Sequence, residues 1–147
     1  MSYFMRFFLT DGPPPSVDAI AAALGQRDSA VLLTHDGAED ARADLYFADK
    51  LYAEIEVNSL GDEVFDEDRD ELLDELAKQD DPRAAEAAEH LRETTGAVVL
   101  CVYEPGHEDY PRLNLLIDWL FETRAGTLQV DEEGLFDRYG RRIVALL

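Results

Sequence analysis

Apolar residues recur along this chain at two spacings, and the spacing changes several times between its ends. Strict alternation of apolar and polar residues predicts a β-strand with one face in the core, whereas apolar residues three or four apart predict an amphipathic helix. Residues 51–58 show the alternation plainly. It assigns one strand face to Leu51, Ala53, Ile55 and Val57 and the opposite face to Tyr52, Glu54, Glu56 and Asn58.

Further strands are predicted where short apolar runs are bounded by turn residues. They fall at 3–9, at 30–34, at 97–103 and in two parts of 44–58, where a tight turn is expected near Asp49 and Lys50 after a polar loop at 35–43. The run at 97–103 is apolar throughout, which is typical of a strand covered on both faces. A hairpin or three-strand meander is expected over 127–147.

Helices are predicted from apolar stripes and from residues that cap or stop a helix. The acidic segment 61–81 forms the second of four, because Phe65, Leu72, Leu73 and Leu76 are spaced to fall on one stripe. The first helix is expected between Ser16 and Gly25. The third is expected to start at Asp80 or Asp81 with Pro82 and to end at Gly96. The fourth follows a loop at 104–111 and is expected to run from Asp109 or Tyr110 to Gly126.

This order of strands and helices predicts one α+β domain over residues 1–147, with a mainly antiparallel sheet and helices packed on one face. A ferredoxin-like core with added C-terminal strands is the expected topology. The strand at 3–9 is apolar on both faces, so a partly covered sheet would leave an apolar patch. A homodimer is one expected way of burying that patch.

Charge narrows the classes of partner. The chain has 33 acidic and 13 basic residues, a formal net charge of −20, which disfavours binding to nucleic-acid phosphates or to anionic membrane surfaces. The only cysteine, Cys101, lies in an apolar strand, where a buried thiol is expected, and it excludes an intramolecular disulfide. Without a signal-peptide pattern or an apolar run of about 20 residues, a cytoplasmic protein is predicted.

Negative charge is most concentrated in residues 61–81, which carry eleven carboxylates against one arginine and one lysine. On a helix, acids four residues apart repel by about 0.2–0.5 kcal/mol per pair, and from Asp66 to Glu75 the segment holds four such pairs. A helix selected only for stability would include lysines between them. We therefore predict that a basic partner protein binds here, through Asp62, Glu63, Asp66, Glu67, Asp70, Glu71, Asp74 and Glu75.

Small size, a single domain and strong acidity resemble bacterial inhibitor or immunity proteins that neutralise basic toxins and, less closely, small secretion chaperones. The resemblance rests on composition and architecture, without a shared motif. It implies a non-enzymatic protein that acts by binding another protein.

Two other interpretations remain open from the sequence. A ligand-binding domain or small enzyme would have its site on the strand face that carries Glu54 and Glu56, with Tyr52 beside them and Arg6 across from them. Alternatively, a salt-adapted protein would carry the same charge with no binding site. The first predicts a pocket around these four residues, and the second predicts an acidic coat spread evenly over the surface.

Motifs for catalysis, cofactors or metals are not found in the sequence, so no catalytic, cofactor-binding or metal-binding residue is predicted. A calcium loop that begins at Asp66 would need glycine and glutamate where Glu71 and Ala77 stand. The three histidines are expected on unrelated elements, at His35, His90 and His107.

Overall fold

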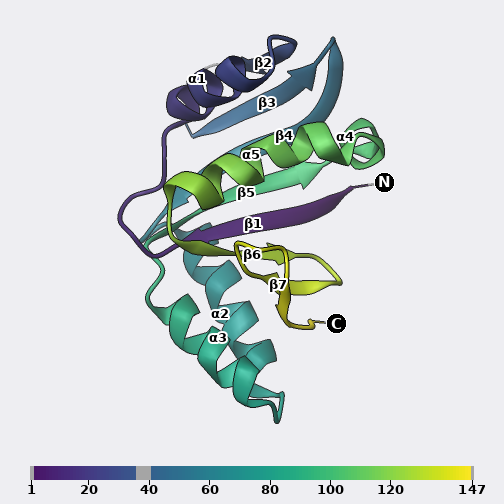
Figure 1. Cartoon of the computed structure of the whole chain (residues 1–147). Coiled ribbons are helices and arrows are strands. Elements are labelled where there is room, and N and C mark those ends of the chain that lie inside the picture. The colour runs from purple at the N-terminus through teal and green to yellow at the C-terminus, as the bar shows by residue number, and fades with distance from the viewer. Residues whose placement is uncertain (1, 36–40, 147) are drawn as a thin grey trace.

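One antiparallel sheet of eight strands crosses the molecule in the order β2-β3-β4-β5-β1-β6-β7-β8 (Figure 1). The computed structural model describes residues 2–35 and 41–146. Its elements are β1 (Tyr3–Leu9), α1 (Val17–Arg27), β2 (Val31–Thr34), β3 (Arg42–Phe47), β4 (Lys50–Ser59), α2 (Glu63–Ala77), α3 (Pro82–Arg92), β5 (Gly96–Val102), α4 (Glu104–Glu108), α5 (Tyr110–Thr123), β6 (Gly126–Val130), β7 (Gly134–Phe136) and β8 (Arg142–Val144). The predicted α+β class and antiparallel sheet are confirmed.

Strand β1 lies in the middle of the sheet, paired with β5 on one side and β6 on the other. Its side chains alternate between two separate hydrophobic cores, as successive residues of a strand must. Met5, Phe7 and Leu9 join the core that includes α1 and α5, and Phe8 joins the core that includes α2 and α3. All four are fully buried. The apolar composition of both faces of this strand therefore reflects helices on both sides.

The prediction that the helices pack on one face of the sheet is wrong. Helices α1 and α5 cover one face, and the successive helices α2 and α3 cover part of the other (Figure 1). The reason is the apolar content of both faces of the sheet, since Ala97 and Val99 of β5 need a cover different from that of Val98 and Leu100. The ferredoxin-like topology is not confirmed.

A β-bulge in the β3–β4 hairpin reverses part of the predicted alternation. Leu45 pairs with Ala53, but the next residue of β3, Tyr46, pairs with Leu51, so Tyr52 is an extra residue on β4. Tyr52 and Ala53 consequently both belong to the core under α1 and α5, and Leu51 lies on the opposite face, beside Tyr46. The predicted faces of Leu51 and Tyr52 are therefore exchanged. The hairpin itself closes through Ala48 and Asp49, both at positive φ.

Several predicted boundaries are confirmed and others are displaced. The Ser16 hydroxyl accepts a hydrogen bond from the Ala19 amide at 3.1 Å, and Asp81 caps α3 by accepting from the Arg83 amide at 2.9 Å. Gly25 does not stop α1, which continues to Arg27. Gly96 and Gly126 begin strands instead of ending helices.

Two predicted loops and the C-terminal segment complete the comparison. The loop expected at 104–111 contains the short helix α4, with Pro105 in its first turn, where proline is tolerated. The loop expected at 35–43 falls mainly on residues 36–40, outside the described residues. The C-terminal meander is confirmed, because β6, β7 and β8 pair in succession.

The displaced Tyr52 links the hairpin to the start of α5. Its ring stacks at a tilt on Phe47, with centroids 4.8 Å apart, and its hydroxyl donates a hydrogen bond to the Asp109 carboxylate at 2.6 Å. Burial raises the pKa of Tyr52 above its ordinary value of 10.0, and the hydrogen bond to Asp109 raises it further. The protonated hydroxyl of Tyr52 therefore stabilises the folded state fully at neutral pH. This contribution is lost as the pH rises through the raised pKa of Tyr52.

We expect Tyr52→Phe to lower the free energy of unfolding by about 1 kcal/mol, because the Asp109 carboxylate loses its donor while the ring contacts remain. Urea denaturation at neutral pH measures the change. Tyr139→Phe is the matched control, since that side chain is 72% exposed. Equal stability of the two variants would show that the hydrogen bond to Asp109 contributes nothing.

Candidate functional site

A broad cleft of about 1380 Å³ lies where β1 and α2 meet the C-terminal meander. Eight carboxylates line it: Asp68, Glu71 and Glu75 of α2, Asp118 of α5, and Asp131, Glu132, Glu133 and Asp137 of the meander. The basic or titratable nitrogen groups in its lining are Arg6, His107 and Arg138. The cleft is larger than a typical small-molecule pocket of about 300–1,000 Å³, so it suits an extended ligand better than a small one.

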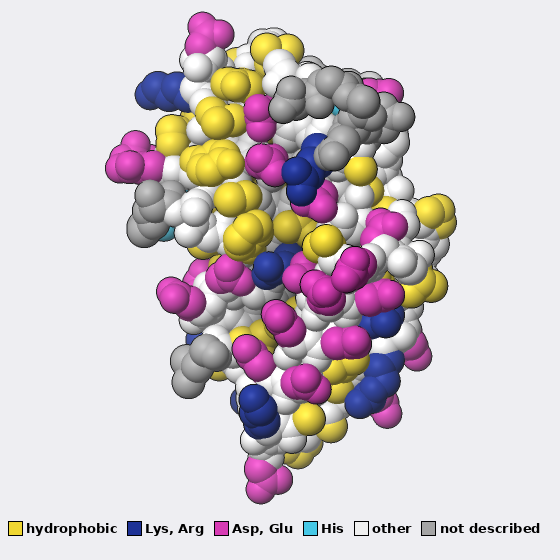
Figure 2. All heavy atoms as spheres, turned by 180° about the vertical axis from the view of Figure 1, so that it is seen from behind, with side chains coloured by type: hydrophobic (Ala, Val, Ile, Leu, Met, Phe, Trp, Pro, Cys, Tyr) yellow, Lys and Arg dark blue, Asp and Glu magenta, His cyan; other side chains and the backbone are white. Residues whose placement is uncertain are grey.

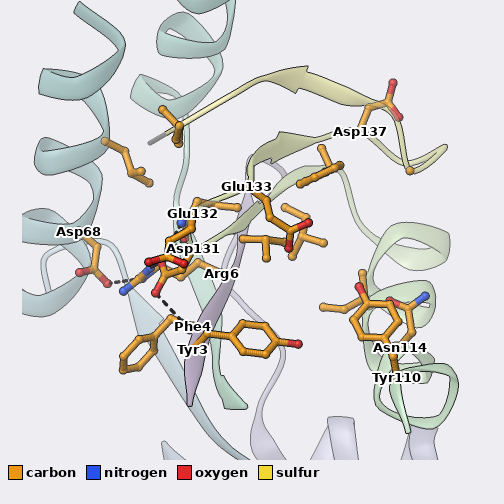
Figure 3. A pocket seen from close by; sticks show the side chains of 18 of the residues that line it. Tyr3, Phe4, Arg6, Asp68, Tyr110, Asn114, Asp131, Glu132, Glu133 and Asp137 are labelled. Carbon is orange, nitrogen blue, oxygen red and sulfur yellow. Dashed lines mark hydrogen bonds and ion pairs between the residues drawn. The ribbon is translucent and has the colours of Figure 1, made fainter. Parts of the chain in front are cut away.

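Arg6 lines this cleft and joins three elements (Figure 3). Its guanidinium donates to the Asp68 carboxylate of α2 at 3.1 Å, to the Gln129 side-chain oxygen of β6 at 2.8 Å and to the Asp131 carboxylate at 3.1 Å. The same group stacks on the Phe4 ring, 5.0 Å from its centroid. Because Asp68 and Asp131 share this one cation, Arg6 ties α2 to the sheet. Of the other acids of the cleft, Asp137 is paired with Arg141 at 3.0 Å.

The acidic surface of α2 is the set of eight residues predicted to bind a partner. Seven of them are exposed, and Asp66 is half-buried. Arg69 lies 3.7 Å from Asp66 and 4.0 Å from Asp70, so it partly neutralises these two. Asp62 accepts from the Ser59 amide just before the helix, at 2.7 Å.

A stripe of three glutamates on α2 has no such compensation. Among the described residues, Glu67, Glu71 and Glu75 form no ion pair, and each is four residues from the next. Glu71 and Glu75 also line the cleft. The acidic surface of α2 therefore continues into the cleft, where it meets carboxylates from the other end of the chain.

The helix holds these charges because its opposite side is well buried. Phe65, Leu72 and Leu76 are at most 8% exposed and pack into the second core with alanines of α3. Burying such side chains contributes about 1.5–3 kcal/mol each, which exceeds the repulsion of the four acid pairs. The helix therefore forms although repulsion between its acids lowers its stability by a modest amount.

Negative potential in the cleft also acts on its tyrosines. Burial raises the pKa of Tyr3, and the carboxylate of Glu133 raises it further. Burial likewise raises the pKa of Tyr110, followed by the effects of Tyr3 and Glu133. Both hydroxyls therefore stay protonated at neutral pH and are available as hydrogen-bond donors.

The alternative site does not assemble from its four predicted residues. Arg6 and Glu56 both pair with Val99, from opposite sides of β5, so they share a face of the sheet but lie two strands apart. Glu56 forms a cross-strand ion pair with Arg42 at 3.1 Å. The bulge places Tyr52 on the opposite face, away from Glu54. The structure brings Arg6 to the acidic helix instead.

Sequence reasoning missed the carboxylates that the meander contributes. The stretch "DEEG" at 131–134 was interpreted only as a turn, and Asp68 was omitted from the predicted surface. Glu132 has a positive φ of 65°, a backbone conformation that marks the tight turn between β6 and β7. The available signal in the sequence is the cluster of three acids at this turn. Because the turn is far from α2 in the sequence, the cluster alone does not predict that these acids lie near the acids of α2.

The histidines and the cysteine complete the inventory of reactive groups. His107 lines the cleft and meets the Tyr3 ring edge-on at 5.6 Å, and His35 lies 3.3 Å from the Asp18 carboxylate. Among residues 2–35 and 41–146, no three His, Cys, Asp or Glu side chains are grouped as a metal ion requires. Cys101 is half-buried, so its thiol is more accessible than predicted.

We expect Arg6→Met to lower the free energy of unfolding by about 1–2 kcal/mol, because it leaves Asp68 and Asp131 without their shared donor. Arg27→Met is the matched control. Its ion pair with Glu122 is more exposed and should contribute at most about 1 kcal/mol. Chemical denaturation compares the two, and an equal loss would contradict a special role for Arg6.

Removing the central charge of the glutamate stripe should stabilise the fold. Glu71→Gln relieves repulsion from both Glu67 and Glu75, so we expect the free energy of unfolding to rise by about 0.4–1 kcal/mol in low salt. The gain should shrink as sodium chloride screens the charges. Glu86→Gln is the control, since the residues three and four positions from Glu86 include one acid, Glu89, and one arginine, Arg83. No gain for Glu71→Gln in dilute buffer would mean that α2 stores no repulsion.

Comparisons with known proteins do not identify a family for this chain. Neither a protein-family model, nor a curated protein, nor a solved structure matches the chain. Within the described part of the chain, every helix is too short or too polar to cross a membrane. The site must therefore be interpreted from its own chemistry.

Proposed function

We propose that this protein is a non-enzymatic binding protein whose acidic surface of α2, together with the adjoining cleft, receives a basic partner protein. The observation that carries the proposal is the meeting of unpaired glutamates of α2 with Asp131, Glu132 and Glu133 of the meander in one cleft. Eight carboxylates from distant parts of the sequence line this cleft, and two of them, Asp68 and Asp131, are bonded to Arg6.

Such an arrangement favours lysine- and arginine-rich ligands. Concentrated charge of one sign accelerates the encounter with an oppositely charged protein and orients it. The size of the cleft suits a segment of protein chain, and its electrostatics oppose nucleic acid and anionic lipid. In this manner of action it would resemble inhibitor or immunity proteins and secretion chaperones. The single free thiol is consistent with a cytoplasmic location, which belongs to the same proposal.

On the face drawn in Figure 2 the charge is uneven, which favours this proposal over salt adaptation. Acidic side chains are densest over the middle and lower part of that face, and fewer lie among the apolar side chains above them. A salt-adapted coat would instead be spread evenly. Both ideas predict strong salt dependence, so location must separate them.

Two variants with equal charge change test where the binding charge lies. Glu67→Gln, Glu71→Gln and Glu75→Gln are combined on α2, and Glu86→Gln, Glu89→Gln and Glu93→Gln are combined on and just after α3. Both remove three exposed negative charges. Affinity capture from the native host, with quantitative mass spectrometry, compares each variant with the wild type. We expect the α2 variant to lose basic proteins that the α3 variant retains, by about tenfold.

Recovery of an identical set of proteins by the α2 variant and the wild type would end the docking proposal. Equal losses by both variants would assign the binding to overall charge and support the salt-adapted alternative. Circular dichroism before capture establishes that each variant is folded. Repeating the capture in high salt should abolish the difference, because exposed charges are screened.

A further inference from the structure

The face of the sheet that carries α2 and α3 is only partly covered. Beyond these helices an apolar surface is open to solvent, and Leu32 is 55% and Phe4 40% exposed. Figure 2 shows this surface as apolar side chains gathered directly above the acidic region. We name it the apolar sheet face and define it by Phe4, Leu32, Tyr46, Leu51, Cys101 and Tyr103.

Strand pairing places these side chains together, except for Tyr103, which follows β5 and interacts with Cys101. Tyr46 pairs with Leu32 on β2 and with Leu51 on β4, and residues directly opposite in antiparallel strands share a face. Phe4 pairs with Cys101 in the same way, and Cys101 is two residues from Val99 of the second core. The bulge at Tyr52 is essential, because it turns Leu51 onto this face and withdraws the tyrosine from it.

The apolar sheet face is bordered by acids. Asp44 and Glu54 pair with each other across β3 and β4, and Glu54 pairs with Cys101. At the other border, Phe4 lines the cleft together with Asp68 and Glu71 of α2. The apolar sheet face and the acidic surface of α2 are therefore neighbours, with Arg6 between them, stacked on Phe4 and bonded to Asp68.

An apolar surface next to an acidic one favours a particular kind of binding partner. A second copy of the chain would bring its own net charge of −20 and the same acidic borders against these ones, so like charges would oppose its docking. A segment with both apolar and basic side chains would satisfy both parts of the surface. Its apolar residues would cover the sheet while its lysines or arginines met α2.

We propose that the apolar sheet face and the acidic surface of α2 form one composite docking site for an amphipathic, basic segment of a partner protein. This inference rests on the proposed function and specifies the chemistry of the partner. Binding then requires two features together, apolar side chains and positive charge, and a purely polar basic chain would bind more weakly.

Two synthetic peptides serve as probes. The first has about 14 residues, close to four helical turns, with leucines on one side and lysines on the other. The second has serine at every leucine position and therefore the same charge. Fluorescence anisotropy of labelled peptides measures their affinities for the full chain. We expect the leucine peptide to bind about tenfold more tightly than the serine peptide.

Variants of the protein assign that difference to a surface. Combined Leu32→Ser and Leu51→Ser should weaken binding of the leucine peptide about tenfold and leave the serine peptide unchanged. Leu60→Ser with Tyr139→Ser is the matched control, since these side chains are 58% and 72% exposed but lie outside the apolar sheet face. Circular dichroism confirms folding of both pairs.

The outcomes separate this inference from the proposed function. Unchanged binding of the leucine peptide to the Leu32/Leu51 variant would overturn the composite site. If the Glu67/Glu71/Glu75 variant nevertheless weakens both peptides, the acidic docking proposal stands alone. If that variant weakens neither peptide, the proposed function itself fails. A wild-type dimer in sedimentation that becomes monomeric in the Leu32/Leu51 variant would show that a second copy occupies the face, which also overturns the inference.

Discussion

The guanidinium of Arg6 is the one charged group on a strand otherwise built of apolar and aromatic residues, and the arrangement of the acids depends on it. A cation in the centre of a sheet needs carboxylates or carbonyl oxygens close by, because desolvation without partners is costly. Asp68 arrives from α2 and Gln129 and Asp131 from β6 and its turn. By meeting this need, the fold brings an acidic helix and an acidic turn against each other, although Asp68 and Asp131 are 63 positions apart in the sequence.

Hydrophobic burial is what allows the charges to remain concentrated. Helix α2 presents leucines to α3 and Phe65 to Phe8, whose ring centroids are 6.2 Å apart. The second core thus fixes the position of the helix, and the repulsion on its outer side is tolerated. Charged and buried residues are separated between two sides of one helix, which explains how an unfavourable charge pattern coexists with regular secondary structure.

Much of the local structure was predictable, because it follows from short-range rules. The bounds of β1, the Ser16 cap and the Asp81–Pro82 start of α3 all follow from neighbouring residues. Long-range features were not predictable. The bulge at Tyr52 cannot be recognised from the alternation of apolar and polar residues in 51–58. It moves Tyr52 to the face opposite Glu54, so the site expected around Glu54 does not form. The apolar residues on both faces of β1 indicate that both faces of the sheet are covered. Which helices cover each face is known only from the structure, where α2 and α3 pack on the face opposite α1 and α5.

The sheet ends on both sides in very short strands, four residues in β2 and three in β8. Short edges offer few unpaired backbone groups, which limits the addition of a foreign strand and the edge-to-edge aggregation that follows from it. Under the proposed function, the partner would therefore recognise side chains on a broad face, without β-augmentation. Such recognition is tunable by single surface substitutions, so related chains could diverge in specificity while the backbone scaffold stayed the same.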